Sequence, residues 1–131
     1  MKGYIDNIER LTKENENFRK VLYTGKHSQL VLMTLKPGEE IGEEIHEDHD
    51  QFFRIDEGSG KVIIDGQETL IEDGFAVVVP AGAKHNVVNT GESELKLYTI
   101  YSPPEHRDGV VHATREVAMA DDEHFDGKTS E

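Results

Sequence analysis

The chain has 131 residues, no cysteine and a net charge of −13, from 14 basic and 27 acidic residues. A chain of this length fits one folded domain. Without cysteine there can be no disulfide, thiolate nucleophile or zinc finger, so any metal must bind nitrogen and oxygen ligands. The acidic balance repels phosphate backbones and anionic lipids, so we expect no nucleic-acid or membrane partner. The N-terminus lacks the apolar core of a signal peptide, and we expect a cytoplasmic protein.

The acidic residues gather in two stretches of the chain. Residues 37–57 hold nine acids and one base, and residues 116–131 hold six acids and one base. The second stretch has little apolar surface to bury, so we expect a solvated tail. We predict three parts: an N-terminal arm at 1–27, a barrel at 28–115 and an acidic C-terminal tail at 116–131. The first stretch differs from the tail because histidines and a glutamine stand between its carboxylates.

Taken in chain order, the sequence predicts one short helix followed by strands. Residues 7–16 have apolar positions at helical spacing, with Asn7 as a candidate N-cap. From Leu30 onwards, short runs rich in β-branched residues alternate with glycine and proline. These runs predict strands at 30–35, 61–64, 67–71, 75–79 and 95–100, and Asp65-Gly66 predicts a tight hairpin turn. Roughly seven or more short strands in one small domain predict an all-β sandwich or barrel.

Glycines, a proline and polar residues form two spaced patterns within this strand region. The first pattern is Gly38, five residues, Glu44-Ile45-His46, four residues, Gln51, six residues and Gly58. The second pattern is Gly74, five residues, Pro80-Ala81-Gly82, two residues, His85, three residues and Asn89. Their spacings resemble the two cupin motifs, except that Glu44 replaces the usual first histidine and Gln51 the usual glutamate. The resemblance implies an all-β, double-stranded β-helix (jelly-roll) cupin barrel with a short N-terminal arm and one metal inside.

The motif positions make Glu44, His46, Gln51 and His85 the candidate metal ligands. Glu44 and His46 lie two apart on an extended segment, so their side chains leave the same face. Gln51 shares a face with two apolar residues of its own run, which directs its amide towards the same interior. Two imidazoles, one carboxylate and one amide oxygen suit one divalent transition metal, such as Mn, Fe, Ni, Zn or Cu, without ranking these metals.

Two alternatives to this ligand set stay open. His49 is a competing ligand, because an imidazole binds transition metals better than a glutamine amide does. However, His49 in either histidine position of the motif would need a glycine where Glu43 or Ile41 stands. The second alternative is a barrel that has lost its metal through the substitutions at Glu44 and Gln51. His46 and His85 would then be hydrogen-bonded in the interior.

Longer runs of the sequence also resemble a group of small single-domain bacterial cupins described as mannose-6-phosphate isomerase-like. These runs are EEIHEDHDQFFRIDEGSGKV, VVVPAGAKHNVVNTG and LKLYTIYSPPEH. The resemblance implies a metal-binding barrel that binds or acts on a small molecule, with isomerase and dioxygenase chemistry both open, and it names no substrate. The alternatives are a non-catalytic module for a small molecule or metal, and a scaffold with a vestigial site.

Further residues have weaker roles in this interpretation. Tyr98, Tyr101 and His112 are candidate bases, and His106 and His112 are candidates for covering the barrel mouth. The charge of the first acidic stretch disfavours a phosphosugar substrate, because few cations stand near the predicted ligands. The resemblance also implies a homodimer. We further expect that the N-terminal arm adds a strand to the partner through the segment 18–23, which contains Phe18, Val21, Leu22 and Tyr23.

Overall fold

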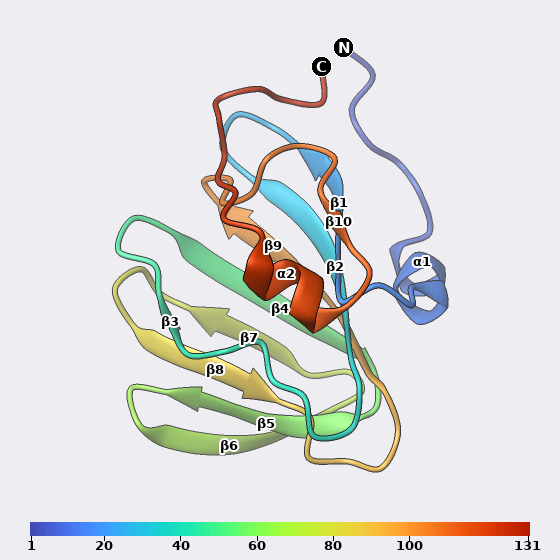
Figure 1. Cartoon of the computed structure of the whole chain (residues 1–131), viewed down its shortest axis with the longest axis vertical. Coiled ribbons are helices and arrows are strands. Elements are labelled where there is room, and N and C mark those ends of the chain that lie inside the picture. The colour runs from blue at the N-terminus through green and yellow to red at the C-terminus, as the bar shows by residue number, and fades with distance from the viewer.

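Two antiparallel sheets enclose the interior of the protein in the computed structural model, which describes residues 1–131 (Figure 1). One sheet comprises β1 (Arg19–Thr24), β2 (Gln29–Leu35), β4 (Asp50–Glu57), β7 (Ala76–Val79), β9 (Leu95–Ser102) and β10 (Val111–His112). The other comprises β3 (Glu44–Ile45), β5 (Ser59–Ile64), β6 (Gln67–Glu72) and β8 (Lys84–Val88). The strand orders are β10-β1-β2-β9-β4-β7 in the larger sheet and β3-β8-β5-β6 in the smaller one. This architecture confirms the predicted all-β double-stranded β-helix.

The local predictions for the hairpin and the first helix are confirmed. Asp65 and Gly66 link β5 to β6 with φ values of 47° and 85°, the positive pair that a tight turn of this twist requires. The helix α1 (Ile8–Glu14) is capped by Asn7, whose side chain accepts a hydrogen bond from the Arg10 backbone N–H at 3.1 Å. Neither α1 nor the second helix is long and apolar enough to cross a membrane.

The buried Lys96 attaches α1 to the larger sheet. Its ammonium group donates to the backbone carbonyls of Lys13 at 2.8 Å and Asn15 at 2.7 Å, and to the Glu16 carboxylate at 3.0 Å. These acceptors lie at the C-terminal end of the helix, where carbonyl groups lack partners within the helix and where the helix dipole favours a cation. The fold therefore surrounds this buried cation with hydrogen-bond acceptors.

The two ends of the chain pack more closely onto the barrel than the sequence predicts. The prediction that residues 18–23 add a strand to a partner is wrong, because β1 pairs within its own chain with both β2 and β10. The helix α2 (Arg115–Ala120) forms where the acidic tail begins, and Glu123 is buried rather than solvated. Past Glu123, the Phe125 backbone N–H donates to the Glu105 carbonyl at 2.9 Å. The acidic composition of the tail does not indicate that Glu123 and Phe125 pack onto the rest of the chain.

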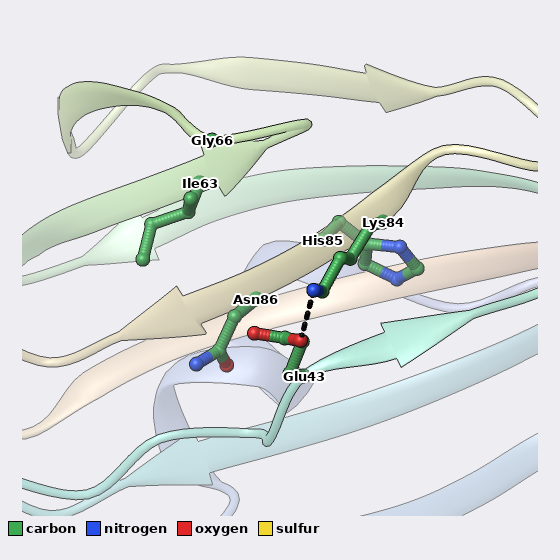
Figure 2. A pocket seen from close by; sticks show the side chains of 6 residues that line it. All are labelled: Glu43, Ile63, Gly66, Lys84, His85 and Asn86. Carbon is green, nitrogen blue, oxygen red and sulfur yellow. Dashed lines mark ion pairs between the residues drawn. The ribbon is translucent and has the colours of Figure 1, made fainter.

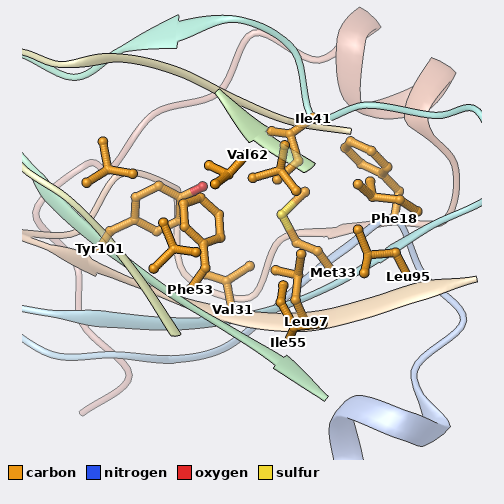
Figure 3. Packing of buried hydrophobic residues seen from close by; sticks show 14 of the residues in the cluster. Phe18, Val31, Met33, Ile41, Phe53, Ile55, Val62, Leu95, Leu97 and Tyr101 are labelled. Atoms are coloured by element: carbon orange, nitrogen blue, oxygen red, sulfur yellow. The ribbon is translucent and has the colours of Figure 1, made fainter. Parts of the chain in front are cut away.

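The barrel interior has an apolar end and a polar end. Phe18 and Leu95 lie at one end of the buried apolar cluster and Tyr101 lies at the other (Figure 3). Tyr101 on β9 pairs with Gln51 on β4, so both side chains point inwards at the polar end. Arg19 on β1 also faces inwards, because it pairs with the buried Met33. Gln51 and Tyr101 therefore reach the polar end from two strands, and Arg19 adds a cation to the interior beside the Phe18 ring.

We predict that Gly58→Ala costs far more stability than Gly66→Ala. Both glycines have positive φ, 88° and 85°, but a Cβ at Gly58 would lie 2.5 Å from the Glu94 carbonyl oxygen, whereas a Cβ at Gly66 has open space. The free energy of unfolding should fall by about 3 kcal/mol or more for Gly58→Ala and by about 1 kcal/mol for Gly66→Ala. Urea denaturation measures both values, and equal losses would contradict the close approach of the two backbone segments.

Candidate metal centre

Three of the four predicted ligands converge from two segments of the chain. Glu44 on β3 pairs directly with His85 on β8, and His46 follows β3 immediately. Each residue offers one ligand atom, and these atoms all lie within 4.8 Å of one another. The Glu44 Oε2 atom is 2.7 Å from the His46 Nε2 atom, and the rings of His46 and His85 are 5.3 Å apart between centroids.

The fourth predicted ligand, Gln51, reaches this cluster from the opposite sheet. Its Oε1 atom is 3.1 Å from the His85 Nε2 atom, and its amide nitrogen donates to the Thr99 hydroxyl at 3.0 Å. The His85 Nδ1 atom lies 3.1 Å from the Ala83 carbonyl, which can only accept, so this nitrogen carries the ring proton. The His85 Nε2 lone pair therefore faces the Gln51 oxygen, and two acceptors meet without a hydrogen atom between them.

This arrangement fits a metal ion better than it fits a hydrogen-bonded core. The His46 Nε2 atom is buried without a hydrogen-bond partner, although the Glu44 carboxylate is near, because their relative orientation is not that of a hydrogen bond. Two ligands that each bond an ion at about 2.1 Å lie about 3 Å apart when the bonds meet at a right angle. The separations of 2.7 Å and 3.1 Å in the two facing pairs are of that size.

His49, the competing ligand, belongs to a second group of side chains. His46, His49 and Glu105 also place ligand atoms within 4.8 Å of one another. The His49 Nε2 atom lies 3.0 Å from the Pro104 carbonyl and 3.3 Å from the Glu105 carboxylate. Because the carbonyl can only accept, this nitrogen carries a proton and its lone pair is not free. The other nitrogen of His49 keeps the alternative open.

Glu105 lies near the His46 Nδ1 atom, on the side of the ring that faces away from Glu44, and was not predicted as a site residue. Its Oε2 atom lies 3.7 Å from the His46 Nδ1 atom. A carboxylate in this position favours the proton on Nδ1, which leaves the Nε2 lone pair directed towards Glu44 and His85. Glu105 lies beyond both spaced patterns, in the segment after β9, so no motif position marked it.

The electrostatics of the cluster couple Glu44 to His46. Burial acts to raise the pKa of Glu44, but the contact with His46, together with the charges of His46, Arg19 and His85, outweighs it and holds the pKa below its ordinary value. Burial acts to lower the pKa of His46, but Glu44 and then Glu105 outweigh it and raise the pKa. The carboxylate therefore stays ionised at neutral pH, and because it favours the protonated form of His46, protons compete with a metal for this imidazole.

A second buried network adjoins the cluster through Tyr101. The rings of Tyr101 and His46 meet edge to face at 5.9 Å, and the Tyr101 hydroxyl lies 3.3 Å from the His106 Nε2 atom. The His106 Nδ1 atom donates to the Glu123 carboxylate at 2.7 Å. Burial lowers the pKa of His106 and keeps the ring neutral, so its Nε2 atom accepts from the hydroxyl. His106 thus lies beside the site, whereas the candidate base Tyr98 packs on Phe52 at the outer face.

A separate pocket of about 130 Å³ lies on the outer face of the smaller sheet. Figure 2 shows the ion pair of Lys84 with Glu43 at this pocket, where the two side chains lie 2.8 Å apart. His85 also lines the pocket, but Glu44, His46 and Gln51 do not. Because adjacent residues of a strand point to opposite faces, the pocket lies behind the cluster and is not part of it.

We predict that Glu123→Gln destabilises the protein in a pH-dependent way. Burial acts to raise the pKa of Glu123, but the hydrogen bonds from His106 and the Arg107 backbone N–H outweigh it and lower the pKa from 4.5 to about 2. This carboxylate therefore stabilises the fold above pH 4.5, and its contribution is lost as the pH falls towards about 2. The free energy of unfolding at pH 7 should fall by about 2 kcal/mol.

Thermal and urea unfolding of Glu123→Gln and wild type across this acid range measure the effect. The difference between the two proteins should shrink as the pH falls from 4.5. The exposed Asp122→Asn is the matched control in the same tail and should behave as wild type. A constant difference at every pH would show that the carboxylate charge has no part in attaching the tail.

Known proteins share this fold and much of this sequence. The cupin domain family matches residues 31–101. An uncharacterised protein of Bacillus subtilis, YrkC, is 49% identical over 126 residues, which cover 91% of this chain and 67% of YrkC. The crystal structure of BH2720 from Bacillus halodurans superposes with a TM-score of 0.90 at 45% identity, covering 92% of this chain and 96% of that one.

A more distant similarity links the chain to a larger protein. A mannose-1-phosphate guanylyltransferase of Salmonella montevideo is 32% identical over 78 residues, which are 60% of this chain and 17% of that protein. With the domain match spanning more than half of the sequence and two close relatives covering most of it, the chain is a member of the cupin family.

Proposed function

We propose that the barrel holds one divalent transition metal through Glu44, His46, Gln51 and His85, and that a small molecule binds and reacts at this metal. The observation that carries the proposal is the convergence of unshared lone pairs. The His46 Nε2 atom has no hydrogen-bond partner, and the His85 Nε2 atom faces another acceptor. Buried polar atoms normally find partners, and an ion would be the shared partner of all four groups.

The metal would supply Lewis-acid character to a bound oxygen atom of the substrate. The chain's own residues would orient the ligands and handle the proton. Glu105 holds the His46 ring from behind, and Ala83 fixes the tautomer of His85. Burial raises the pKa of Tyr101, so its hydroxyl stays protonated at neutral pH and donates a hydrogen bond. His106 would accept the proton of this hydroxyl at Nε2, and Glu123 would accept the proton that His106 carries on Nδ1.

The chain of Tyr101, His106 and Glu123 favours proton-transfer chemistry, such as isomerisation, over dioxygenation. An isomerase must move a proton beside the metal, and these three residues form a continuous path for one. Dioxygenation does not need such a path. The similarity to the guanylyltransferase does not extend this proposal to nucleotidyl transfer, because it covers only 17% of that protein. An oxygen electrode with small diketones and hydroxy acids separates the two classes of reaction.

We predict that substitutions of the proposed ligands differ in their effect on metal affinity. His85→Ala should abolish most binding, because it removes a lone pair at the centre of the cluster. Gln51→Ala should weaken binding modestly, because a neutral amide is the poorest donor of the four. His49→Ala should leave binding nearly unchanged. Titration of the stripped proteins with Mn(II), Ni(II) or Zn(II) measures all three.

The exposed His27→Ala is the matched control for loss of a histidine. If His49→Ala loses the metal and Gln51→Ala keeps it, the ligand set must be rebuilt around His46, His49 and His85. If the wild-type protein binds none of the three ions, the barrel has a vestigial site and the proposal fails.

We also predict that metal affinity falls as the pH is lowered. A protonated histidine cannot bind a metal. Because Glu44 raises the pKa of His46 above 6.5, competition from protons should begin above that pH and grow as the pH falls through the pKa. Below the pKa, the logarithm of the association constant should fall by at least about one for each pH unit. Titrations from about pH 8 to 5.5 measure this slope. A metal affinity that does not change over this pH range would exclude His46 as a ligand.

A further inference from the structure

Arg19 is a buried cation that no carboxylate neutralises. The residue is only 5% exposed. Its guanidinium makes one hydrogen bond, from Nη1 to the His112 Nδ1 atom at 3.2 Å, and it lies 5.4 Å from the centre of the Phe18 ring. The buried Nε atom has no hydrogen-bond partner. An arginine has five N–H donors, so most of the hydrogen-bonding capacity of this side chain is unused.

The contrast with Lys96 shows that this fold is able to satisfy a buried cation. Lys96 is as deeply buried as Arg19, yet its ammonium has two backbone carbonyls and the Glu16 carboxylate as partners. Removing a charge from water is costly unless the charge is paired and hydrogen-bonded. The open donors of Arg19 therefore point to a partner that binds from outside the chain.

The guanidinium lies on the inner side of the barrel, next to the candidate metal centre. Arg19 pairs with Met33, which belongs to the buried core. The tail connects Arg19 to the network beside the metal cluster. His112, the hydrogen-bond partner of Arg19, donates to Asp121, and Glu123, two residues further along, accepts from His106, which contacts the Tyr101 hydroxyl. A ligand that contacts Arg19 would thus lie beside the proposed metal.

His112 positions Arg19 without neutralising it. Because arginine can only donate, the His112 Nδ1 atom accepts, and the proton of the neutral ring is on Nε2. That Nε2 atom donates to the Asp121 carboxylate at 2.9 Å. These two contacts, from Asp121 to His112 and from His112 to Arg19, hold the guanidinium at its Nη1 atom only. Its remaining N–H groups stay available for a ligand.

We propose that Arg19 makes the barrel interior a site for a small carboxylate anion, which its guanidinium fork binds beside the metal. This inference rests on the proposed function and names its substrate class. The fork matches the two oxygens of a carboxylate. A phosphate dianion fits less well, because the single cation of Arg19 would face two negative charges.

Thermal unfolding of the full chain in a buffer free of carboxylates tests this site. Propionate is the probe, propionamide is its neutral isostere, and inorganic phosphate is the dianion. Wild-type protein should melt at a higher temperature with propionate and be unaffected by propionamide. Arg19→Met should lose this shift, and its affinity for propionate by calorimetry should fall at least about tenfold. Without ligand, Arg19→Met should melt no lower than wild type, because the variant removes an unpaired buried charge.

Two control variants separate the site from general effects of charge and folding. Lys20→Gln removes an exposed cation from the opposite face of β1 and should keep the full shift. Arg19→Lys keeps the charge without the fork, so it should retain a smaller shift, and it tests the site if Arg19→Met does not fold. A propionate shift in Arg19→Met or in Arg19→Lys equal to that of wild type would overturn the proposal. Stabilisation by phosphate alone would overturn it as well.

Metal titration of the same proteins keeps the two proposals distinguishable. If the wild-type protein binds Mn(II) but not propionate, the carboxylate site is wrong and the metal centre stands. If propionate binds in an Arg19-dependent way to a protein that takes up no metal, the anion site stands and the proposed metal function fails. Arg19→Met should bind Mn(II) within a few fold of wild type, because Arg19 is not a ligand.

Discussion

Gln51 and His85 meet inside the barrel at 3.1 Å, and this contact joins the two sheets at the candidate centre. Gln51 belongs to the larger sheet and His85 to the smaller one, so neither sheet alone could form the site. Each side chain is also held from its other end, Gln51 by Thr99 and His85 by the Ala83 carbonyl. The two acceptor atoms are therefore fixed face to face, which is costly unless a cation lies between them.

The apolar end of the barrel provides the rigidity that this arrangement needs. Phe53, Ile55 and Leu97 are almost completely buried, and they share strands with Gln51 and Tyr101. A close-packed interior resists small displacements, so the polar atoms cannot easily turn away from one another. The strain of facing lone pairs is then balanced by apolar burial elsewhere in the same strands, and a partner ion or ligand would relieve it.

The charges around the cluster come largely from the last third of the chain. Glu105 reaches His46 from the segment after β9, and Glu123 reaches His106 from the acidic tail. Arg19 enters from β1, and Asp121 holds it indirectly through His112. The barrel therefore carries the proposed ligands, while segments beyond the two motifs set the protonation and orientation of the groups beside them. In this chain the tail is part of the environment of the site.

The sequence by itself determined the elements whose cause is local. The Asp65-Gly66 turn, the cap at Asn7 and the alternation through Gln51 depend on neighbouring residues alone, and the spacing of the two patterns identified the barrel. Tertiary structure decided what lies beside each side chain. Arg19, Glu105 and Glu123 have no local signal, because their partners are at least sixteen positions away or lie on another strand. Whether a charge is solvated or buried depends on such distant contacts, and the sequence shows none of them directly.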